Sequence, residues 1–395
     1  MEIAAEKKKY KSGLALSGGG YRATLFAVGS LWRLNELGVL KTLSRITAVS
    51  GGSITLGYLA LHWKELKFDK NNVATNYKEL IADPLQTFCS QKLDIMAILT
   101  GLLSPFDTIG NKVAKAYDER LFKGALLKDI PSGKGIPEFI FYATNFDTGS
   151  SVRITKDTVY DYKIGEAPIQ DMLLAHAVGA SSAFPPIFSP VILDSSQWAW
   201  KKTKLAQLYD YQEGILRKQL TLVDGGLYDN LGLEAIWKED PNSSDHFDPV
   251  LACDAGAPLT IGYGLKPGWL NDLVSKTGLT RNWVSQSLRM SNVMTEQQRA
   301  LRKRQLIDNF IKKVYGGTYW GTTTQIANYE LPDPVATDTE TTKRIAEIPT
   351  RLSTISAQDQ GHLINWGYAL ADAAIRKHVN PGMSRGEQPI KQYPV

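Results

Sequence analysis

The sequence AVSGGS at residues 48–53 constrains this chain most strongly, because it places a serine between a strand and a helix. The apolar, β-branched run at residues 46–49 predicts a short buried strand, and the apolar residues from 54 to 61 predict a helix. A sharp strand-to-helix turn lifts a serine hydroxyl above the edge of a sheet, and it needs small residues two positions before and after that serine. Ala48 and Gly52 satisfy this size rule. Ser50 is therefore a candidate nucleophile.

A second turn offers hydrogen-bond donors for the same chemistry. Gly18, Gly19 and Gly20 follow a short apolar strand at residues 14–16 and precede an apolar-faced helix. A glycine loop can point several N–H groups into one concavity, and the positive end of the next helix adds to their field. We expect these N–H groups, together with that of Gly51, to stabilise a developing oxyanion. Two strand–glycine–helix units also predict a parallel or mixed sheet with helices on its faces.

A nucleophilic serine needs a base, and Asp224 is the candidate. It follows an apolar strand at residues 220–223 and precedes Gly225 and Gly226. None of the five histidines stands in a glycine-flanked turn after a strand. A Ser–Asp dyad requires a partly desolvated carboxylate, because burial raises the pKa of the carboxyl towards the operating pH.

Two other interpretations compete with acyl transfer. Residues 18–23 also satisfy G-x-G-x-x-G/A, the fingerprint of dinucleotide-binding proteins. That fingerprint requires an acidic residue at the end of the second strand, where this chain has Ser50, Gly51 and Gly52. In the other interpretation, every glycine turn belongs to a non-catalytic scaffold. Three such turns in consistent places favour the enzyme.

Composition limits the class of protein. The chain has 45 basic and 40 acidic residues, a net charge of +5, and no basic stripe interleaved with aromatic residues, so nucleic acid is not an expected partner. Cys89 and Cys253 fit neither a metal nor a disulfide pattern, which favours a reducing compartment. Neither a secretory signal nor a membrane-spanning run is evident. We expect a cytoplasmic protein with peripheral membrane contact at most.

The remaining chain predicts one α/β domain with additions. Strands are expected at residues 139–145, 152–155 and 250–253, and helices at 169–179, 284–314 and 361–378. We interpret the basic stretch from Arg299 to Lys313 as a solvated helix face, and residues 194–219 as a polar insertion. Residues 93–106 are the most apolar segment; they are expected to pack on the sheet, with a lid or interfacial helix as the alternative.

Taken together, three motifs resemble the patatin-like phospholipases and their relatives, the group IV cytosolic phospholipases. They are SGGGYRA at residues 17–23, VSGGS at 49–53 and DGG at 224–226, and residues 180–186 are similar to a further segment of the family. The matches keep the family's order from residue 12 to about 256, whereas the last third resembles bacterial members loosely. Ala48 stands where the usual elbow motif has its first glycine.

The resemblance implies a three-layer α/β/α fold with a central, mostly parallel sheet. It implies a single domain over residues 1–395, with a catalytic core at 12–256 and a helical, decorating part at 257–395. It also implies a dyad of Ser50 and Asp224, an oxyanion hole from residues 18–20, and hydrolysis of lipid acyl esters without metal or cofactor. By the same resemblance, Arg22 either binds the lipid phosphate or braces the glycine loop, and a surface salt bridge on the first helix is the alternative.

We therefore expect a serine acyl hydrolase that releases fatty acids from phospholipids or lysophospholipids at a membrane surface. Residues 93–106 form a hypothetical route for the acyl chain. Two alternatives remain open: a general carboxylesterase or neutral-lipid lipase, and a latent phospholipase effector that a partner or ligand activates. The sequence leaves the need for an activator and the oligomeric state undecided.

Overall fold

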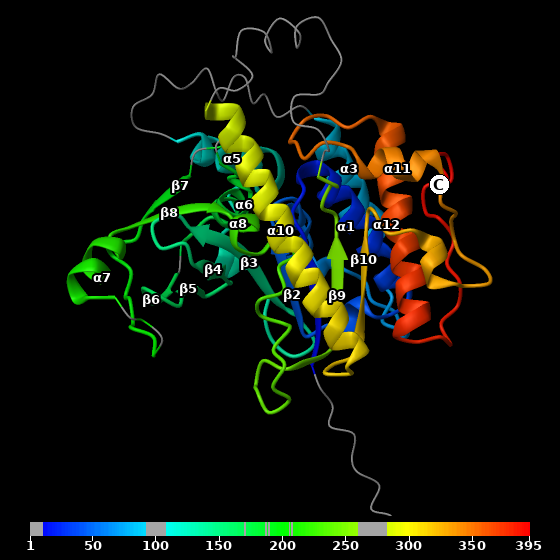
Figure 1. The fold of residues 1–395 in the computed structure, drawn as a ribbon, viewed down its shortest axis with the longest axis horizontal. Helices are drawn as coiled ribbons and strands as arrows, with labels where there is room; N and C mark the ends of the chain where they lie inside the picture. The colour runs from blue at the N-terminus through cyan, green and yellow to red at the C-terminus, as the bar shows by residue number, and fades with distance from the viewer. Residues whose placement is uncertain are drawn as a thin grey trace, which may run out of the picture.

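The structure is a computed structural model that describes residues 11–91, 108–169, 171–185, 188, 190–204, 206, 208–259 and 283–395. The described residues form one 10-stranded sheet with helices packed against both of its faces (Figure 1). Residues 93–106, the hypothetical acyl-chain route, lie outside the described ranges. Among the described helices, none is long and apolar enough to cross a membrane.

The sheet is parallel at its centre and antiparallel on one side. Its strand order is β10-β9-β1-β2-β3, all parallel, followed by β4, β5 and β6 in antiparallel pairing. Strand β8 also pairs antiparallel with β3 and carries β7. The strands are β1 (Lys11–Leu16), β2 (Arg45–Val49), β3 (Glu138–Asn145), β4 (Ser151–Ile154), β5 (Thr158–Asp161), β6 (Gly165–Pro168), β7 (Val191–Asp194), β8 (Gln219–Asp224), β9 (Phe247–Asp254) and β10 (Gly317–Gly321).

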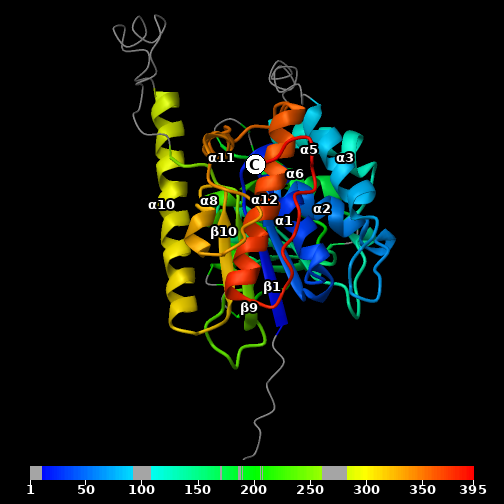
Figure 2. The same ribbon diagram turned by 90° about the vertical axis from the view of Figure 1, so that its right-hand side faces the viewer.

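Helices α1, α2, α3, α5, α6 and α12 lie on one face of the sheet, and α8 and α10 lie on the other (Figure 2). This arrangement confirms the expected three-layer α/β/α fold. The helices are α1 (Gly20–Glu36), α2 (Gly51–Leu61), α3 (Asp83–Ser90), α5 (Ile109–Tyr117), α6 (Leu174–Ser182), α7 (Asp210–Leu216), α8 (Gly226–Asp229), α10 (Trp283–Ile311), α11 (Glu340–Ala346) and α12 (Ala357–His378).

The central strands are apolar along both faces, because each face is covered by helices. In β1, Leu14 and Leu16 enter the large core cluster beneath α1, α2 and α12. Ala15 points the other way, into a smaller cluster that includes Leu306 of α10. An uninterrupted hydrophobic run in the sequence therefore becomes a strand buried between two layers.

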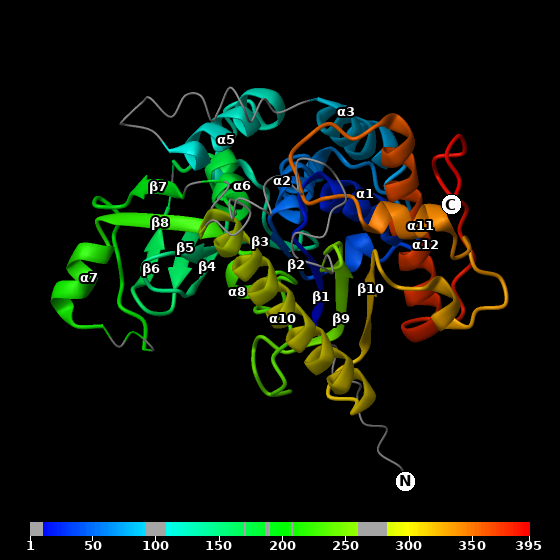
Figure 3. The same ribbon diagram turned by 45° about the horizontal axis from the view of Figure 1, so that its top comes forward.

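The last third of the chain is built into this core, although we expected residues 257–395 to decorate it. Strand β10 extends the parallel sheet beside β9, and α12 packs along α1. The expected insertion at residues 194–219 instead lies at the far end of the sheet from α12, where it carries α7 (Figure 3). The C-terminal part therefore lies against the elements that carry the candidate site.

Two glycines let α1 and α12 approach closely. A Cβ atom on Gly29 would lie 1.8 Å from the carbonyl oxygen of Ile364, and one on Gly367 would lie 2.1 Å from that of Phe26. No side chain fits at either distance. The pairing of these two helices therefore depends on backbone contact at these positions.

We predict that Gly29→Ala lowers the free energy of unfolding by about 1–3 kcal/mol, because the added methyl group forces the two helices apart. Gly214 in α7 is the control, since a Cβ atom there meets nothing within 4 Å. Gly214→Ala is expected to be neutral or to stabilise the protein by up to about 1 kcal/mol through helix propensity. Urea unfolding of both variants measures the difference, and equal effects would contradict the close packing.

Candidate active site

Ser50 stands on a strained turn between β2 and α2. Its backbone angles, φ 51° and ψ −121°, are rare for a residue with a side chain, and such strain is typical of functional sites. Its N–H donates to the hydroxyl of Ser181, at the C-terminal end of α6, over 2.9 Å. The expected elbow geometry is therefore present at Ser50, at the edge where the parallel strands end.

The glycines that follow Ser50 allow this turn to contact the glycine loop. A Cβ atom on Gly51 would lie 2.0 Å from the carbonyl oxygen of Gly20, and one on Gly52 would lie 2.7 Å from that of Leu16. The two turns are in backbone contact at these positions. Ser50 is thereby held beside the N-terminus of α1, where positive φ angles occur at Gly19 (148°) and Gly20 (59°).

Asp224 ends β8 and lies against Ser50. Its side chain is buried, and its Oδ1 accepts the N–H of Gly226 over 2.7 Å. Burial raises the pKa of this carboxyl from 3.8 to about 7, although hydrogen bonds from Gly226 and from the Ser50 hydroxyl oppose the increase. A carboxylate with a pKa near neutrality and in hydrogen-bonding contact with a serine can accept the proton of that serine.

The four predicted oxyanion donors are not equivalent. The N–H of Gly18 donates to the carbonyl oxygen of Asn230 over 3.0 Å, which removes Gly18 from the available donors. The N–H groups of Gly19, Gly20 and Gly51 have no acceptor among the described residues. These three groups lie where the two turns meet, so they remain candidates for binding a developing oxyanion.

Arg22 takes the bracing position and has no exposed surface to offer a phosphate. Its Nε donates to the carbonyl oxygen of Ala255 over 2.9 Å, and its Nη2 donates to Thr350 Oγ1 over 3.0 Å. Nη1 donates to the carbonyl oxygen of Ile348. Burial, followed by repulsion from Arg299, lowers the pKa of this guanidinium to about 10, so it stays charged at neutral pH. Arg22 thus ties the start of α1 to β9 and to the C-terminal segment.

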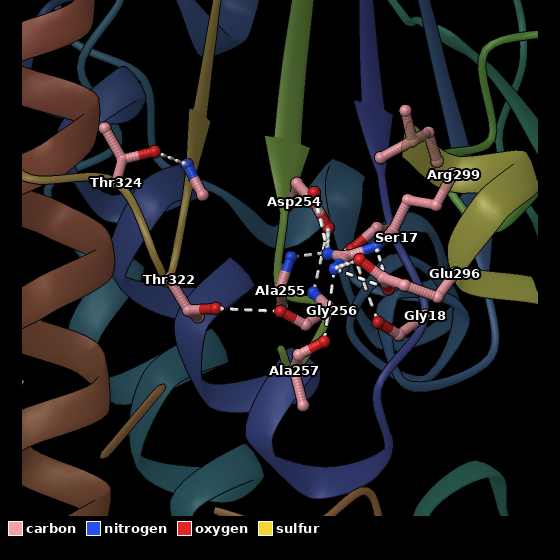
Figure 4. Close-up of polar contacts among 12 residues, drawn as sticks. Ser17, Gly18, Asp254, Ala255, Gly256, Ala257, Glu296, Arg299, Thr322 and Thr324 are labelled. Carbon is pink, nitrogen blue, oxygen red and sulfur yellow. Dashed lines mark hydrogen bonds and ion pairs between the residues drawn. The ribbon is translucent and has the colours of Figure 1, made fainter. Parts of the chain in front are cut away.

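A buried ion pair supports the glycine loop from the other layer (Figure 4). Arg299 of α10 donates from Nη1 to both carboxylate oxygens of Asp254 at 3.0 Å, and Tyr319 donates to Asp254 Oδ2 over 2.6 Å. Burial alone would raise the pKa of Asp254, but Arg299, Tyr319 and the Gly256 N–H outweigh it and lower the pKa. The next residue, Ala255, donates its N–H to Ser17 Oγ over 2.6 Å. Ser17 is the residue directly before the glycine loop.

Sequence reasoning missed several of these residues. The expectation of a solvated face was wrong for Arg299 and Arg302, because Arg299 is buried and Arg302 pairs with Asp229 and Glu234, whereas Arg304, Lys312 and Lys313 are exposed as expected. Ser181 belongs to a segment that we had singled out, but its bond to the Ser50 N–H had no sequence signal. The backbone contact of Asn230 with Gly18 likewise depends on no particular side chain. His62 pairs with Glu65 near the end of α2, consistent with its exclusion as a base.

Comparison with known proteins places these features in context. A family model described as patatin-like phospholipase matches residues 14–237. Similar solved structures include human GIVD cytosolic phospholipase A2 in complex with methyl gamma-linolenyl fluorophosphonate, with a TM-score of 0.49, 13% identity, and coverage of 92% of this chain and 57% of that chain. Another is VipD from Legionella pneumophila, with a TM-score of 0.36, 14% identity, and coverage of 92% and 66%. This chain spans little more than half the length of that phospholipase A2 structure. No curated protein matches it.

The raised pKa of Asp224 makes stability depend on pH. The native state keeps this proton up to about pH 7, whereas the unfolded chain releases it near pH 4. The free energy of unfolding therefore falls as the pH rises between these values. We predict that Asp224→Asn gains stability relative to the wild type over this interval, by about 1.4 kcal/mol for each pH unit. Urea unfolding at both ends measures this gain, and a constant difference would contradict a raised pKa.

Removal of Arg299 should leave the Asp254 carboxylate buried without its counter-charge. We predict that Arg299→Met lowers the free energy of unfolding by about 3–5 kcal/mol, and that adding Asp254→Asn restores a large part of it. Lys343→Met is the control, because its ion pair with Glu340 is exposed and should contribute little to stability. Urea denaturation of the wild type, Arg299→Met, Asp254→Asn and the double variant tests the coupling, and additive effects of the two substitutions would contradict it.

Proposed function

The chain belongs to the patatin-like phospholipase family, and from that membership we propose that it is a serine acyl hydrolase that releases fatty acids from phospholipids or lysophospholipids. The family supports a lipid acyl hydrolase activity, and the dyad of Ser50 and Asp224 is our assignment of the residues that perform it. The observation that carries the assignment is the contact between a serine on a strained turn and a buried carboxylate whose pKa is about 7.

In the first half of the reaction, Ser50 Oγ attacks the acyl carbonyl carbon while Asp224 accepts its proton. The carbonyl oxygen gains negative charge, and the N–H groups of Gly19, Gly20 and Gly51 are the donors that stabilise it. When the tetrahedral intermediate collapses, the bond to the alcohol oxygen breaks. Asp224 returns its proton to that oxygen, and the alcohol leaves an acyl-enzyme behind.

In the second half, water attacks the acyl carbon and Asp224 accepts one of its protons. The same N–H groups stabilise the second oxyanion, and collapse releases the fatty acid as the proton returns to Ser50. The carboxylate is thus a base and then an acid in each half. A group with a pKa near the operating pH performs both roles efficiently. No step of this scheme calls for a metal or a cofactor.

Arg22 enters the scheme as a positioning residue. Its donors are committed to Ala255, Ile348 and Thr350, so it fixes the loop that carries Gly19 and Gly20. This arrangement removes the phosphate contact that had favoured phospholipids over other lipids. A general carboxylesterase or neutral-lipid lipase with the same dyad is therefore the second candidate. We expect either enzyme to work in the cytoplasm at the surface of its lipid aggregate.

We predict that the wild type releases fatty acid from mixed phospholipid vesicles. Ser50→Ala and Asp224→Asn should each reduce this release by about 10³-fold or more, because each removes a group that takes part in bond formation. Fatty-acid release from vesicles, triacylglycerol emulsion and a soluble short-chain ester measures activity and lipid class together.

Ser90→Ala is the matched control for loss of a hydroxyl, since Ser90 is exposed and its hydroxyl donates to the carbonyl oxygen of Thr87 within its own helical turn. It should keep full activity. If the enzyme cleaves triacylglycerol or the soluble ester but releases no fatty acid from the vesicles, it is a carboxylesterase or neutral-lipid lipase, the second candidate, and not a phospholipase. A wild type that is inactive on all three substrates would contradict the proposal.

A further inference from the structure

The side chain of Asn230 lies between two glycine turns of the candidate site. A Cβ atom on Gly226 would lie 2.6 Å from Asn230 Oδ1 and 2.9 Å from Asp224 Oδ1. A Cβ atom on Gly18 would overlap with Asn230 Oδ1 and would lie 3.2 Å from Ser50 Cβ. Glycine at both positions therefore leaves the space that the carboxamide occupies, next to both members of the dyad.

The backbone around Asn230 is fixed from two sides. Its own carbonyl oxygen accepts the N–H of Gly18 over 3.0 Å. The preceding residue, Asp229, is buried, and its Oδ2 accepts the N–H of Leu233 over 2.7 Å. Arg302 of α10 pairs with the Asp229 carboxylate at 3.6 Å. The segment that carries the carboxamide is therefore held beside the dyad by the glycine loop and by α10.

The carboxamide of Asn230 has no hydrogen-bond partner among the described residues, and Asn230 is only partly buried. Other asparagines differ: Asn35, Asn145 and Asn365 are buried, and each bonds to the protein through its carboxamide. A polar group that has no protein partner bonds to water or to a ligand. In this place, that water or ligand would also lie beside Ser50 and Asp224.

Two acceptor oxygens come together here. Asn230 Oδ1 and Asp224 Oδ1 lie around the position that a Gly226 side chain would take. Two neighbouring acceptors are stabilised by a donor that bonds to both, and a water molecule has two protons to give. Ser50 lies beside both residues, since its hydroxyl hydrogen-bonds to Asp224 and its Cβ lies near Asn230 Oδ1 across Gly18. A water bonded to both oxygens therefore reaches an acyl group on Ser50 with its lone pairs free.

We propose that Asn230 is a catalytic residue that binds, together with Asp224, the water that hydrolyses the acyl-enzyme. The oxygen of this water forms a bond to the acyl carbon and one proton passes to Asp224, while the other proton stays bonded to Asn230 Oδ1. The bond from the acyl carbon to Ser50 Oγ then breaks, and the proton on Asp224 passes to Ser50. This inference rests on the proposed function, because it assigns a role in the second half of that reaction.

The alcohol oxygen takes the same place in the first half of the reaction. It must leave from the side on which Asp224 can protonate it, and water later attacks from that side. The N–H groups of Gly19, Gly20 and Gly51 bind the carbonyl oxygen instead. Asn230 therefore assists the departure of an alcohol that needs a proton, but not of one that leaves as a stable anion. This difference allows acylation and deacylation to be measured separately.

A soluble nitrophenyl ester separates the two halves. Nitrophenolate leaves without a proton, so Ser50 should be acylated at the wild-type rate in Asn230→Leu, which keeps the branched shape and removes both polar atoms. Deacylation should be slower by about 10²-fold, because the water lacks one of its two contacts. We expect a burst of nitrophenolate followed by slow release, and quenched Asn230→Leu should show the added mass of the acyl group.

Phosphonylation by an alkyl fluorophosphonate reports whether the site is intact. Ser50 Oγ bonds to phosphorus, the P–F bond breaks, the Ser50 proton passes to Asp224 and fluoride leaves, so no water takes part. Asn230→Leu should be labelled at the wild-type rate, whereas Ser50→Ala should not be labelled. Asn242→Leu is the matched control, because Asn242 is exposed in the loop before β9. It should keep wild-type rates in both assays.

Three results with Asn230→Leu would overturn the inference. Unchanged steady-state turnover would exclude a role in hydrolysis. Turnover and labelling that slow by the same factor would show that Asn230 positions the dyad or the oxyanion donors and does not bind the water. Slow turnover without accumulated acyl-enzyme would place the defect before deacylation.

Failure of the proposed function gives a different result. A wild type that is neither labelled nor active on the ester would contradict the hydrolase, and this inference with it. A wild type that is labelled and cleaves the ester, but releases nothing from phospholipid vesicles, would change only the lipid class. The comparison of wild type with Asn230→Leu on the soluble ester would then still decide the role of Asn230.

Discussion

The candidate site depends on contact between two backbone turns. The elbow after β2 and the glycine loop after β1 approach so closely that a Cβ atom on Gly51 would lie 2.0 Å from the Gly20 carbonyl oxygen. This contact brings the Ser50 hydroxyl and the N–H groups of Gly19, Gly20 and Gly51 into one region. Neighbouring parallel strands make it possible, because β1 and β2 end at the same edge of the sheet. Asp224 reaches that region from the antiparallel side, through the pairing of β8 with β3.

Charged residues hold this region in place without taking part in the proposed chemistry. Arg22 and Arg299 are both buried, and both bond near the end of β9. Arg299 satisfies the carboxylate of Asp254, and Arg22 satisfies carbonyl groups that a loop would otherwise leave unpaired. Unpaired buried groups of these kinds cost several kcal/mol. The glycine loop, which has no side chains of its own to pack, therefore takes its position from the charges around it.

Local patterns predicted the strands and turns well, because each glycine turn follows an apolar run in the sequence. The strands at residues 46–49, 220–223 and 250–253 became β2, β8 and β9, and a sheet with helices on its faces followed from such patterns, whereas the three-layer fold was implied by the family resemblance. Arg299 was misread because a basic stretch on a helix looks the same in sequence whether it faces water or a carboxylate. Ser181, Asn230 and the acceptors of Arg22 were beyond sequence reasoning, since their contacts join residues more than 130 positions apart. Such long-range contacts leave no periodic pattern of apolar residues in the sequence.

The brace of the glycine loop has a consequence for the order in which the chain is made. Gly20 and Ser50 leave the ribosome first, and Ile348, Thr350 and the Arg351 carbonyl that accepts the Tyr21 N–H follow about 300 residues later. At a synthesis rate of about 5–20 residues per second, that gap lasts on the order of 15 to 60 seconds. Until Ala255 is made, the Arg22 guanidinium lacks all three of its acceptors, and it lacks Ile348 and Thr350 throughout the interval. The nascent chain thus carries its nucleophile long before it can fix the loop beside it, and translation itself delays completion of the site.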